Sequence, residues 1–227
     1  MKFFQLKFSS HAKIYLIVLA LLVIVFYTFL PFVGTCLLFL LIFVAYFFRD
    51  PDKIVPQDEN LILSPADGII TFIGPSDPPP ETKFKSLDYN KISIFLSIFD
   101  IHINRIPTSG KILSCDYVPG KFFNATLKKS SNENERNIIS IETKYKNTLV
   151  FVQIAGLIAR RIISNVKNNQ EVIIGDRYGI IKFGSRVDIY IPKKIDLRVL
   201  EGQRVIGGET ILADQESKFK ITGNIKK

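Results

Sequence analysis

The sequence predicts a mostly β soluble domain preceded by an α-helical membrane segment, and three observations support this. Residues 14–48 contain no charged side chain, and from residue 51 onward the chain breaks into short apolar or alternating runs. Gly, Pro, Asn and Asp separate those runs, as expected for strands joined by turns. Helical periodicity is weak after residue 48, apart from 156–163. We therefore expect a sandwich or barrel-like fold with Greek-key connections.

The first 48 residues are expected to form a membrane anchor. A spanning helix needs about 20 apolar residues, and Pro31 and Gly34 interrupt the uncharged run near its middle. We expect a helical hairpin with spans of about 14–30 and 35–48, with one long kinked span as the alternative. A secretory signal peptide is disfavoured, because its apolar region is usually about 7–15 residues long. Basic residues on both flanks favour a catalytic domain, residues 49–227, on the cytoplasmic face.

The soluble domain is expected to consist of short strands and exposed loops. The polar stretches 74–86 and 128–137 are expected to be loops. The last two strands bracket Gly207-Gly208 and resemble the hairpin of lipoyl or biotinyl carrier domains, within residues 199–213, although no lysine motif for modification occurs there. The expected strands are 61–63, 68–73, 93–99, 111–118, 138–145, 149–154, 179–183, 187–190, 204–206 and 210–213.

Charge and rare residues limit the classes of partner. The chain has 30 basic and 21 acidic residues. Three lysines precede residue 48, and the other 27 basic residues and all 21 acidic residues follow it, so the soluble part carries a net charge of +6. A basic domain next to a bilayer favours anionic lipid headgroups; a merely solvated surface is the alternative, and no nucleic-acid-binding motif is present. Cys36 and Cys115 are not expected to pair. With two histidines, His11 and His102, we expect no metal centre.

The bond between Gly184 and Ser185 is a candidate site of chemistry. The pair lies between two strand-like runs, 178–183 and 187–191, where a Gly-Ser pair is ordinarily a turn. A backbone held sharply between two strands can also bring the serine hydroxyl onto the preceding carbonyl carbon. An N→O acyl shift would then convert the amide into an ester. Elimination and hydrolysis would leave a ketone-bearing pyruvoyl group in place of Ser185.

Two further residues can assist such a serine. His102 is the only histidine after residue 48, and histidine is the usual base that makes a serine nucleophilic at neutral pH. Asp67, in an Asp-Gly turn, could orient that imidazole, as in a Ser-His-Asp triad. The structural alternatives are a buried core histidine and an ordinary turn. The spacing leaves open whether the three residues meet.

Six motifs, taken in order, resemble the short bacterial form of phosphatidylserine decarboxylase over nearly the whole chain. Each motif alone is modest, whereas the ordered set is specific. The motifs are Phe47-Phe-Arg-Asp-Pro51, Ser64-Pro-Ala-Asp-Gly68, Phe99-Asp-Ile-His-Ile-Asn-Arg105, Asn134-Glu-Arg-Asn137, Gln153-Ile-Ala-Gly-Leu-Ile-Ala-Arg-Arg161 and Gly175-Asp-Arg-Tyr-Gly-Ile-Ile-Lys-Phe-Gly-Ser-Arg186.

The resemblance implies a proenzyme that cuts itself between Gly184 and Ser185. Residues 1–184 would become the β chain and residues 185–227 the α chain, paired as a heterodimer or in a higher oligomer. Ser185 would become a covalent pyruvoyl cofactor, and Asp67 and His102 would activate it for cleavage. Longer family members carry Leu-Gly-Ser-Thr at the cleavage site and a second histidine three positions after the first. This chain has Phe183-Gly-Ser-Arg186 and Arg105 there, so the share of His102 in self-cleavage and in turnover is open.

The implied reaction is decarboxylation of phosphatidylserine to phosphatidylethanolamine and CO2 by a carboxy-lyase of the cell membrane. The substrate amine would form a Schiff base with the pyruvoyl ketone, which accepts the electron pair released with CO2, and His102 is the expected proton donor. Phe122 and Phe123 would either contact the acyl chains of the lipid or pack in the core. Two alternatives are a membrane-anchored serine hydrolase using Ser185, His102 and Asp67, without a Gly-x-Ser-x-Gly elbow, and a noncatalytic lipid-binding domain.

Overall fold

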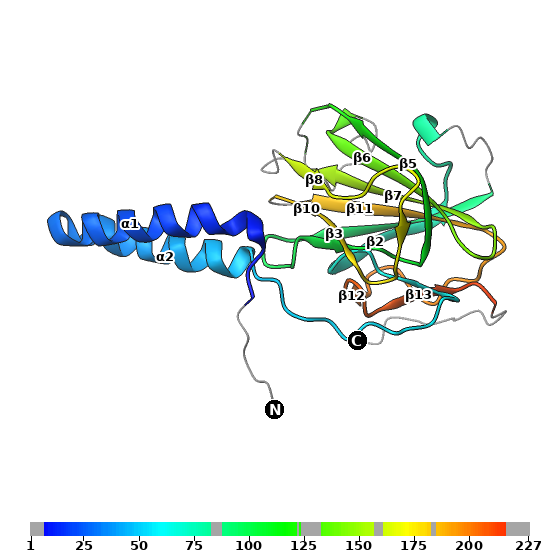
Figure 1. Ribbon diagram of the computed structural model, residues 1–227, viewed down its shortest axis with the longest axis horizontal. Coiled ribbons are helices and arrows are strands. Elements are labelled where there is room, and N and C mark those ends of the chain that lie inside the picture. Colours follow the sequence, from blue (N-terminus) through cyan, green and yellow to red (C-terminus); the bar gives the residue numbers. More distant parts are fainter. Residues whose placement is uncertain are drawn as a thin grey trace. The chain divides into compact units, whose positions relative to one another are not determined.

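The computed structural model describes residues 7–82, 88–121, 123, 133–156, 161–182 and 185–216, and the chain divides into two compact units. The smaller unit contains the chain up to Asp52 together with Phe99–Ile101. The larger unit begins at Lys53 and, after that interruption, resumes at His102. The smaller unit is helical and the larger one is mostly β, which confirms the predicted mostly β fold class with helices at the N-terminus (Figure 1).

A pair of apolar helices forms most of the smaller unit. After a 3-10 turn, η1 (Ser10–Ala12), the chain folds into α1 (Lys13–Phe29) and α2 (Pro31–Phe47). Leu30 alone connects them, and Pro31 takes the first helical position, where its missing N–H costs no hydrogen bond. This helix begins four residues before the second expected span, 35–48, because Pro31 starts the helix rather than lying in a longer connection. The helices approach closely, since a Cβ on Gly34 would lie 2.5 Å from the Cα of Tyr27.

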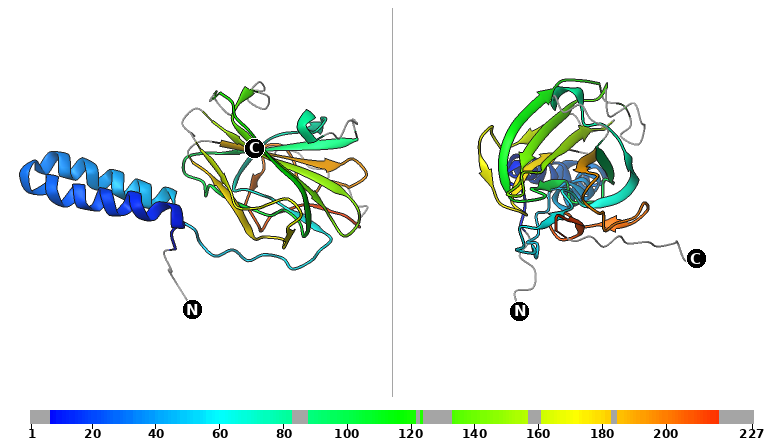
Figure 2. Two further views of the ribbon diagram at one scale, coloured as in Figure 1. Left: turned by 45° about the horizontal axis from the view of Figure 1, so that its top comes forward. Right: turned by 90° about the vertical axis from the view of Figure 1, so that its right-hand side faces the viewer.

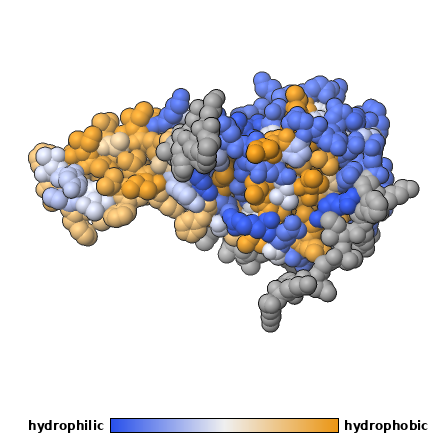
Figure 3. Space-filling view, turned by 90° about the horizontal axis from the view of Figure 1, so that it is seen from below, coloured by the Kyte–Doolittle hydropathy of each residue, from blue (hydrophilic) through white to orange (hydrophobic). Residues whose placement is uncertain are grey.

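Apolar side chains cover much of the surface of both helices (Figure 3). Ile14, Phe29 and Phe32 expose 68%, 77% and 81% of their area. No helix in the described part of the chain is both long enough and apolar enough to cross a membrane. The two membrane spans therefore remain predictions.

Arg49 ties the end of α2 to the segment 99–101. Its guanidinium lies 3.8 Å from the centroid of the Tyr46 ring. It donates hydrogen bonds to the carbonyls of Tyr46 at 2.8 Å and Phe99 at 2.7 Å. The motif Phe47–Pro51 therefore contacts the first residues of the motif Phe99–Arg105 within the smaller unit. The second motif also contains His102.

The described residues of the larger unit form thirteen strands and a 3-10 turn, η2 (Pro80–Thr82). Eight strands make one antiparallel sheet in the order β12-β2-β3-β11-β7-β6-β5-β9, and the others make the sheets β4-β10-β8 and β1-β13. The large sheet is strongly twisted and curved (Figures 1 and 2). The strands are β1 (Leu61–Leu63), β2 (Gly68–Pro75), β3 (Tyr89–Leu96), β4 (Ile103–Arg105), β5 (Gly110–Val118), β6 (Arg136–Glu142), β7 (Thr148–Ala155), β8 (Ile162–Ser164), β9 (Glu171–Val172), β10 (Arg177–Ile181), β11 (Ser185–Pro192), β12 (Arg204–Val205) and β13 (Ile211–Asp214).

Alternation along the central strands builds an apolar cluster on each face of the large sheet. On β7, Phe151 and Ala155 belong to the main core, whereas Val152 and Ile154 belong to a second cluster on the other face. Side chains of β1, β8, β10 and β13 join the main core. This core therefore lies between the large sheet and the two smaller ones, and it includes Val187, Ile189 and Ile191 of β11.

The hairpin expected within residues 199–213 is wrong. β12 and β13 do flank Gly207-Gly208, but β12 pairs with β2 and β13 pairs with β1. The turn is bonded instead to the loop after β1, because the N–H of Gly208 donates to the carbonyl of Ser64 at 2.8 Å. The N–H of Ser64 in turn donates to the carbonyl of Thr210 at 2.8 Å. Two corners from distant parts of the chain thus interlock, which local alternation does not reveal.

Three further segments differ from expectation. The polar stretch 128–137 is not simply an exposed loop: 124–132 lie outside the described residues, but Asn134 is fully buried and β6 begins at Arg136. The helical period at 156–163 ends in strand β8, with 157–160 outside the described residues. In the stretch 74–86, β2 extends to Pro75 and η2 forms, and 83–87 are likewise outside the described residues.

Candidate functional site

Ser185 is the first residue of β11, which lies between β3 and β7 in the large sheet. There it pairs with Leu96 and Ala155. The residue is fully buried, and its hydroxyl has no hydrogen-bond partner among the residues that the structure describes. Burying an unpaired hydroxyl is costly, so such a group is uncommon and marks a candidate for another task. Gly184, the other half of the candidate bond, lies outside the described residues.

Asp67 lies at the same end of the large sheet as Ser185. Ile69, Phe95 and Arg186 form one cross-strand row on β2, β3 and β11. Because β2 and β11 are both antiparallel to β3, they run parallel to each other. Asp67 precedes the row by two residues and Ser185 precedes it by one. With strands about 4.8 Å apart, the main chains of β2 and β11 are about 10 Å apart at this row.

The sheet β4-β10-β8 positions His102 at the same end. His102 directly precedes β4, is 1% exposed, and its carbonyl accepts the N–H of Ile181 at 3.2 Å. Ile181 ends β10, and Ser185 follows four residues later, a connection that spans at most about 14 Å. Two residues further along β4, Asn104 is bonded to Gln153 on β7 at 2.8 Å. The strand register therefore places His102 and Ser185 at one end of the fold.

Asp67 is held by two partners that the sequence does not identify. The Nζ of Lys53 lies 3.1 Å from Oδ1 and 3.2 Å from Oδ2, and the N–H of Gly207 donates to Oδ1 at 2.8 Å. Within the described ranges, Asp67 makes no hydrogen bond to His102. The fold thus brings the three predicted residues to one end without joining Asp67 to His102 directly. In the sequence, Lys53 is one of the basic residues that flank the apolar segment 14–48.

A buried asparagine fixes the main chain beside Ser185. The Nδ2 of Asn134 donates to the carbonyls of Phe123 and Ala155, both at 2.7 Å, and its Oδ1 accepts the N–H of Phe123 at 2.9 Å. Ala155 is the cross-strand partner of Ser185, so Asn134 links the Phe123 segment to the candidate site. Phe122 lies outside the described residues, and contact of either phenylalanine with acyl chains remains a prediction.

Behind Ser185, on the same face of the large sheet, lies a buried cluster of polar side chains. Asn137 donates to Gln153 at 3.0 Å, and Gln153 donates to Asn104 at 2.8 Å. The Sγ of Cys115 lies 3.5 Å from the Oδ1 of Asn137. Burial raises the pKa of the Cys115 thiol, against the opposing effect of its hydrogen bonds with Ser164 and Asn137. These contacts connect β4, β5, β6 and β7, and the row of Asn137 and Gln153 lies two rows behind that of Ser185.

Tyr178 on β10 is a fully buried phenol in the same region. Its ring packs edge-on against Phe151, with ring centroids 5.1 Å apart. In the part of the chain that the structure describes, its hydroxyl has no hydrogen-bond partner. Burial raises the pKa of Tyr178 well above its usual value, and Cys115 adds to the shift.

We expect Tyr178→Phe to be neutral or stabilising by about 1 kcal/mol at pH 7, because it removes an unpaired buried hydroxyl. The raised pKa also predicts alkaline sensitivity in the wild type. Above about pH 10 an unfolded tyrosine loses its proton while folded Tyr178 keeps it, so stability present below pH 10 is lost as the pH rises further. Urea unfolding at pH 7 and above about pH 10 tests this by comparing the free energy of unfolding of the wild type and Tyr178→Phe. Tyr27→Phe, which changes an exposed tyrosine, is the control. Equal alkaline losses in wild type and Tyr178→Phe would contradict it.

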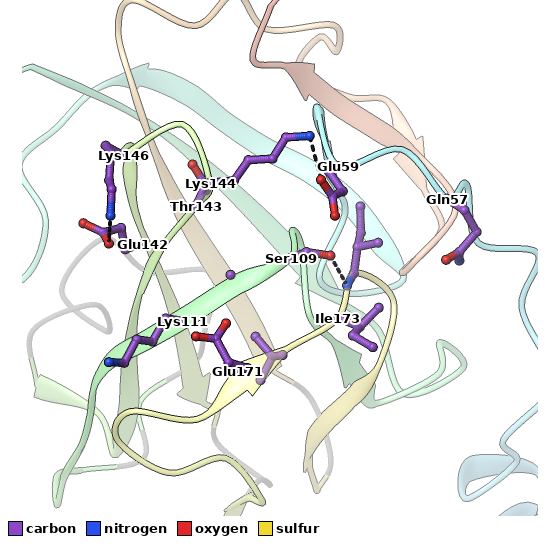
Figure 4. A pocket seen from close by; sticks show the side chains of 13 residues that line it. Gln57, Glu59, Ser109, Lys111, Glu142, Thr143, Lys144, Lys146, Glu171 and Ile173 are labelled. Atoms are coloured by element: carbon purple, nitrogen blue, oxygen red, sulfur yellow. Dashed lines mark hydrogen bonds and ion pairs between the residues drawn. The ribbon is translucent and has the colours of Figure 1, made fainter.

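A cavity of about 840 Å³ lies at the opposite end of the large sheet (Figure 4). Its walls include Lys111 near the start of β5 and Glu142 at the end of β6, which are cross-strand partners. Glu142 lies six residues along β6 from Arg136, which shares a cross-strand row with the residue after Ser185. At about 3.3 Å per residue the cavity is about 20 Å from Ser185. It is therefore separate from the candidate site.

Comparison with known proteins indicates a single family. The sequence model described as phosphatidylserine decarboxylase matches residues 40–213, a range that contains Asp67, His102 and Ser185. The phosphatidylserine decarboxylase proenzyme of Rickettsia typhi is 54% identical over 185 residues, covering 79% of this chain and 80% of that protein. The proenzyme of Rickettsia africae is 56% identical over 169 residues, covering 74% and 73%. With this coverage and identity, the chain belongs to the phosphatidylserine decarboxylase family.

Proposed function

We propose that the chain is a proenzyme that cuts itself between Gly184 and Ser185 and then decarboxylates phosphatidylserine to phosphatidylethanolamine and CO2. The observation that carries the proposal is the hydroxyl of Ser185, fully buried and without a hydrogen-bond partner among the described residues, at the very start of a central strand. Family membership supports the same activity, because the relatives compared above are named phosphatidylserine decarboxylase proenzymes.

Self-cleavage uses the main chain on either side of this hydroxyl. The Oγ of Ser185 attacks the carbonyl carbon of Gly184, its proton passes to a base and then to the amide nitrogen, and the C–N bond breaks to leave an ester. Removal of the α-proton of residue 185 expels the Gly184 carboxylate. Water then replaces the nitrogen, which leaves as ammonia. His102 is the proposed base, and Asp67 the carboxylate that supports it.

Position 185 fits a pyruvoyl group. Its formation removes the serine hydroxyl, and since that hydroxyl makes no hydrogen bond within the described residues, no side-chain hydrogen bond of residue 185 is lost there. The group supplies a ketone that condenses with the substrate amine and accepts the electron pair released when CO2 leaves. Around it, the chain holds the reacting carbon in a water-poor site. His102 is proposed to return a proton to that carbon.

The two products of cleavage, residues 1–184 and 185–227, are proposed to stay together as a heterodimer. Ser185 would become the first residue of the α chain, and all of β11 follows it. Hydrogen-bonded register pairs β11 with β3 from Ser185 to Pro192 and with β7 from Ser185 to Tyr190. Two more strands of the α chain, β12 and β13, pair with β2 and β1. Separation of the chains would break all these ladders.

The catalytic unit is proposed to work at the cytoplasmic face of the cell membrane, held there by the apolar helices α1 and α2. Each has 17 residues, or about 26 Å at 1.5 Å per residue, against a hydrocarbon core of about 30 Å. A net charge of +6 after residue 48 attracts an anionic lipid surface. The substrate is itself an anionic lipid with two acyl chains, so an enzyme on the bilayer meets it where it resides.

Vesicles of neutral lipid with phosphatidylserine labelled at the serine carboxyl test this function. The purified full chain is expected to sediment with the vesicles, to release labelled CO2, and to form one phosphatidylethanolamine per CO2. A serine hydrolase would instead release free serine or fatty acid and no CO2. A noncatalytic lipid-binding domain would sediment without any product, and either result would overturn the proposal.

A further inference from the structure

We propose that Lys53 is a positioning residue for self-cleavage, which acts by holding the carboxylate of Asp67 in its working orientation. The inference rests on the proposed function. Its basis is a close, largely buried ion pair: the Nζ of Lys53 lies 3.1 Å from Oδ1 and 3.2 Å from Oδ2 of Asp67. The two side chains are only 8% and 15% exposed. A pair this buried is held in one geometry, unlike exposed lysine–glutamate pairs.

The carboxylate of Asp67 is held from two sides. Lys53 contacts both oxygens, and the N–H of Gly207 donates to Oδ1 at 2.8 Å. Gly207 is closely packed there, because a Cβ on it would lie 3.1 Å from Oδ1 and 3.0 Å from the carbonyl carbon of Ala66. Oδ1 therefore carries two partners and Oδ2 only one. This asymmetry leaves Oδ2 as the oxygen available to a proton-transfer partner.

The segment that carries Lys53 is fixed along its length. The N–H of Ile54 donates to Glu209 at 3.0 Å. The side chain of Val55 packs onto Gly175, where a Cβ would lie 2.4 Å from the Val55 Cγ1 and where φ is +84°. Lys53 is also the first residue of the larger unit, directly after the smaller one ends at Asp52. The ammonium is thus delivered to Asp67 by an anchored main chain and not by a free linker.

The other charges around Asp67 do not replace Lys53. Arg105 lies next to the same turn, since a Cβ on Gly208 would come 2.7 Å from its Cδ, but its guanidinium donates to the carbonyl of Gly175 at 2.9 Å. Glu209 accepts from Ile54. Among the described residues, Lys53 is the cation that touches Asp67. Its loss should therefore leave the carboxylate held at Oδ1 by the N–H of Gly207 alone, so that Oδ2 is no longer fixed while the fold stays intact.

The test compares Lys53→Met and Lys53→Arg with the wild type in the full chain, made by cell-free synthesis so that cleavage is followed from time zero. We expect Lys53→Met to slow cleavage by about tenfold or more, because small displacements of a catalytic group have large effects on rate. Lys53→Arg should recover most of the rate. Lys144→Met, which breaks the exposed 2.6 Å pair with Glu59, is the matched control and should cleave normally.

A second readout separates positioning from general damage. In the fraction of Lys53→Met that does become cut, turnover per pyruvoyl group is expected to match the wild type, because the proposed work of Asp67 is finished after cleavage. Normal cleavage of Lys53→Met, or equal losses in cleavage and in turnover per pyruvoyl group, overturns the inference. If Lys53→Met cleaves normally, Asp67→Asn shows which proposal has failed. Normal cleavage of Asp67→Asn means that the proposed role of Asp67 fails too. If Asp67→Asn stays whole, only the role of Lys53 fails.

Discussion

Ser185→Ala is expected to leave the chain whole, while the wild type separates into chains of residues 1–184 and 185–227. Alanine has no hydroxyl to attack the carbonyl of Gly184, so the N→O acyl shift cannot begin. An intact mass spectrum gives the result directly. The small wild-type chain should be lighter by one ammonia than the same peptide beginning with serine, since the pyruvoyl group lacks the nitrogen of Ser185.

The fold offers a matched control for this change. Ser140 on β6 is also buried, at 1% exposure, and its hydroxyl likewise has no hydrogen-bond partner among the described residues. Ser140→Ala should therefore cleave normally. Both changes remove an unpaired buried hydroxyl and should leave stability unchanged or raise it by about 1 kcal/mol. Cooperative unfolding of the whole Ser185→Ala chain in urea excludes misfolding as the cause. Cleavage of Ser185→Ala would refute the assignment of the nucleophile.

The longer strands β5 and β7 agree with expectation within a residue or two. β7 is a nearly continuous apolar run, which is typical of a strand buried on both faces. β4, β8 and β9 were not predicted, since two or three residues carry no period. Their formation depends on partners far along the chain, as the pairing of β4 with β10 illustrates.

Buried polar segments defeat prediction from local pattern for a different reason. The stretch that ends at Asn137 looks too polar for a core, yet Asn134 and Asn137 are buried because their amides bond to carbonyls and amides on other strands. The sequence predicts Ser185, His102 and Asp67 as candidate site residues by residue type and resemblance. It gives no reason to single out Lys53, whose contact with Asp67 appears only in the fold.

His102→Gln is expected to reduce turnover per pyruvoyl group by about 10²–10⁴-fold, the usual contribution of a positioned proton donor. The glutamine can occupy the buried site and form hydrogen bonds, but it cannot give up a proton. Slow self-cleavage by this variant is also expected, so the comparison uses only protein that has been cut, with the pyruvoyl ketone counted by hydrazine titration. His11→Gln, which changes the only other histidine of the chain, is the control and should turn over normally.

The two-histidine composition gives a second test that does not depend on cleavage of the variant. In mature His11→Gln enzyme, His102 is the only imidazole. Acylation with diethyl pyrocarbonate should abolish CO2 release while the pyruvoyl ketone remains titratable. Bound phosphatidylserine should slow the loss, because His102 lies at the same end of the fold as Ser185. If acylated enzyme keeps its turnover, or if cut His102→Gln works within about tenfold of the wild type, the returning proton comes from another group. His102 would then serve self-cleavage alone.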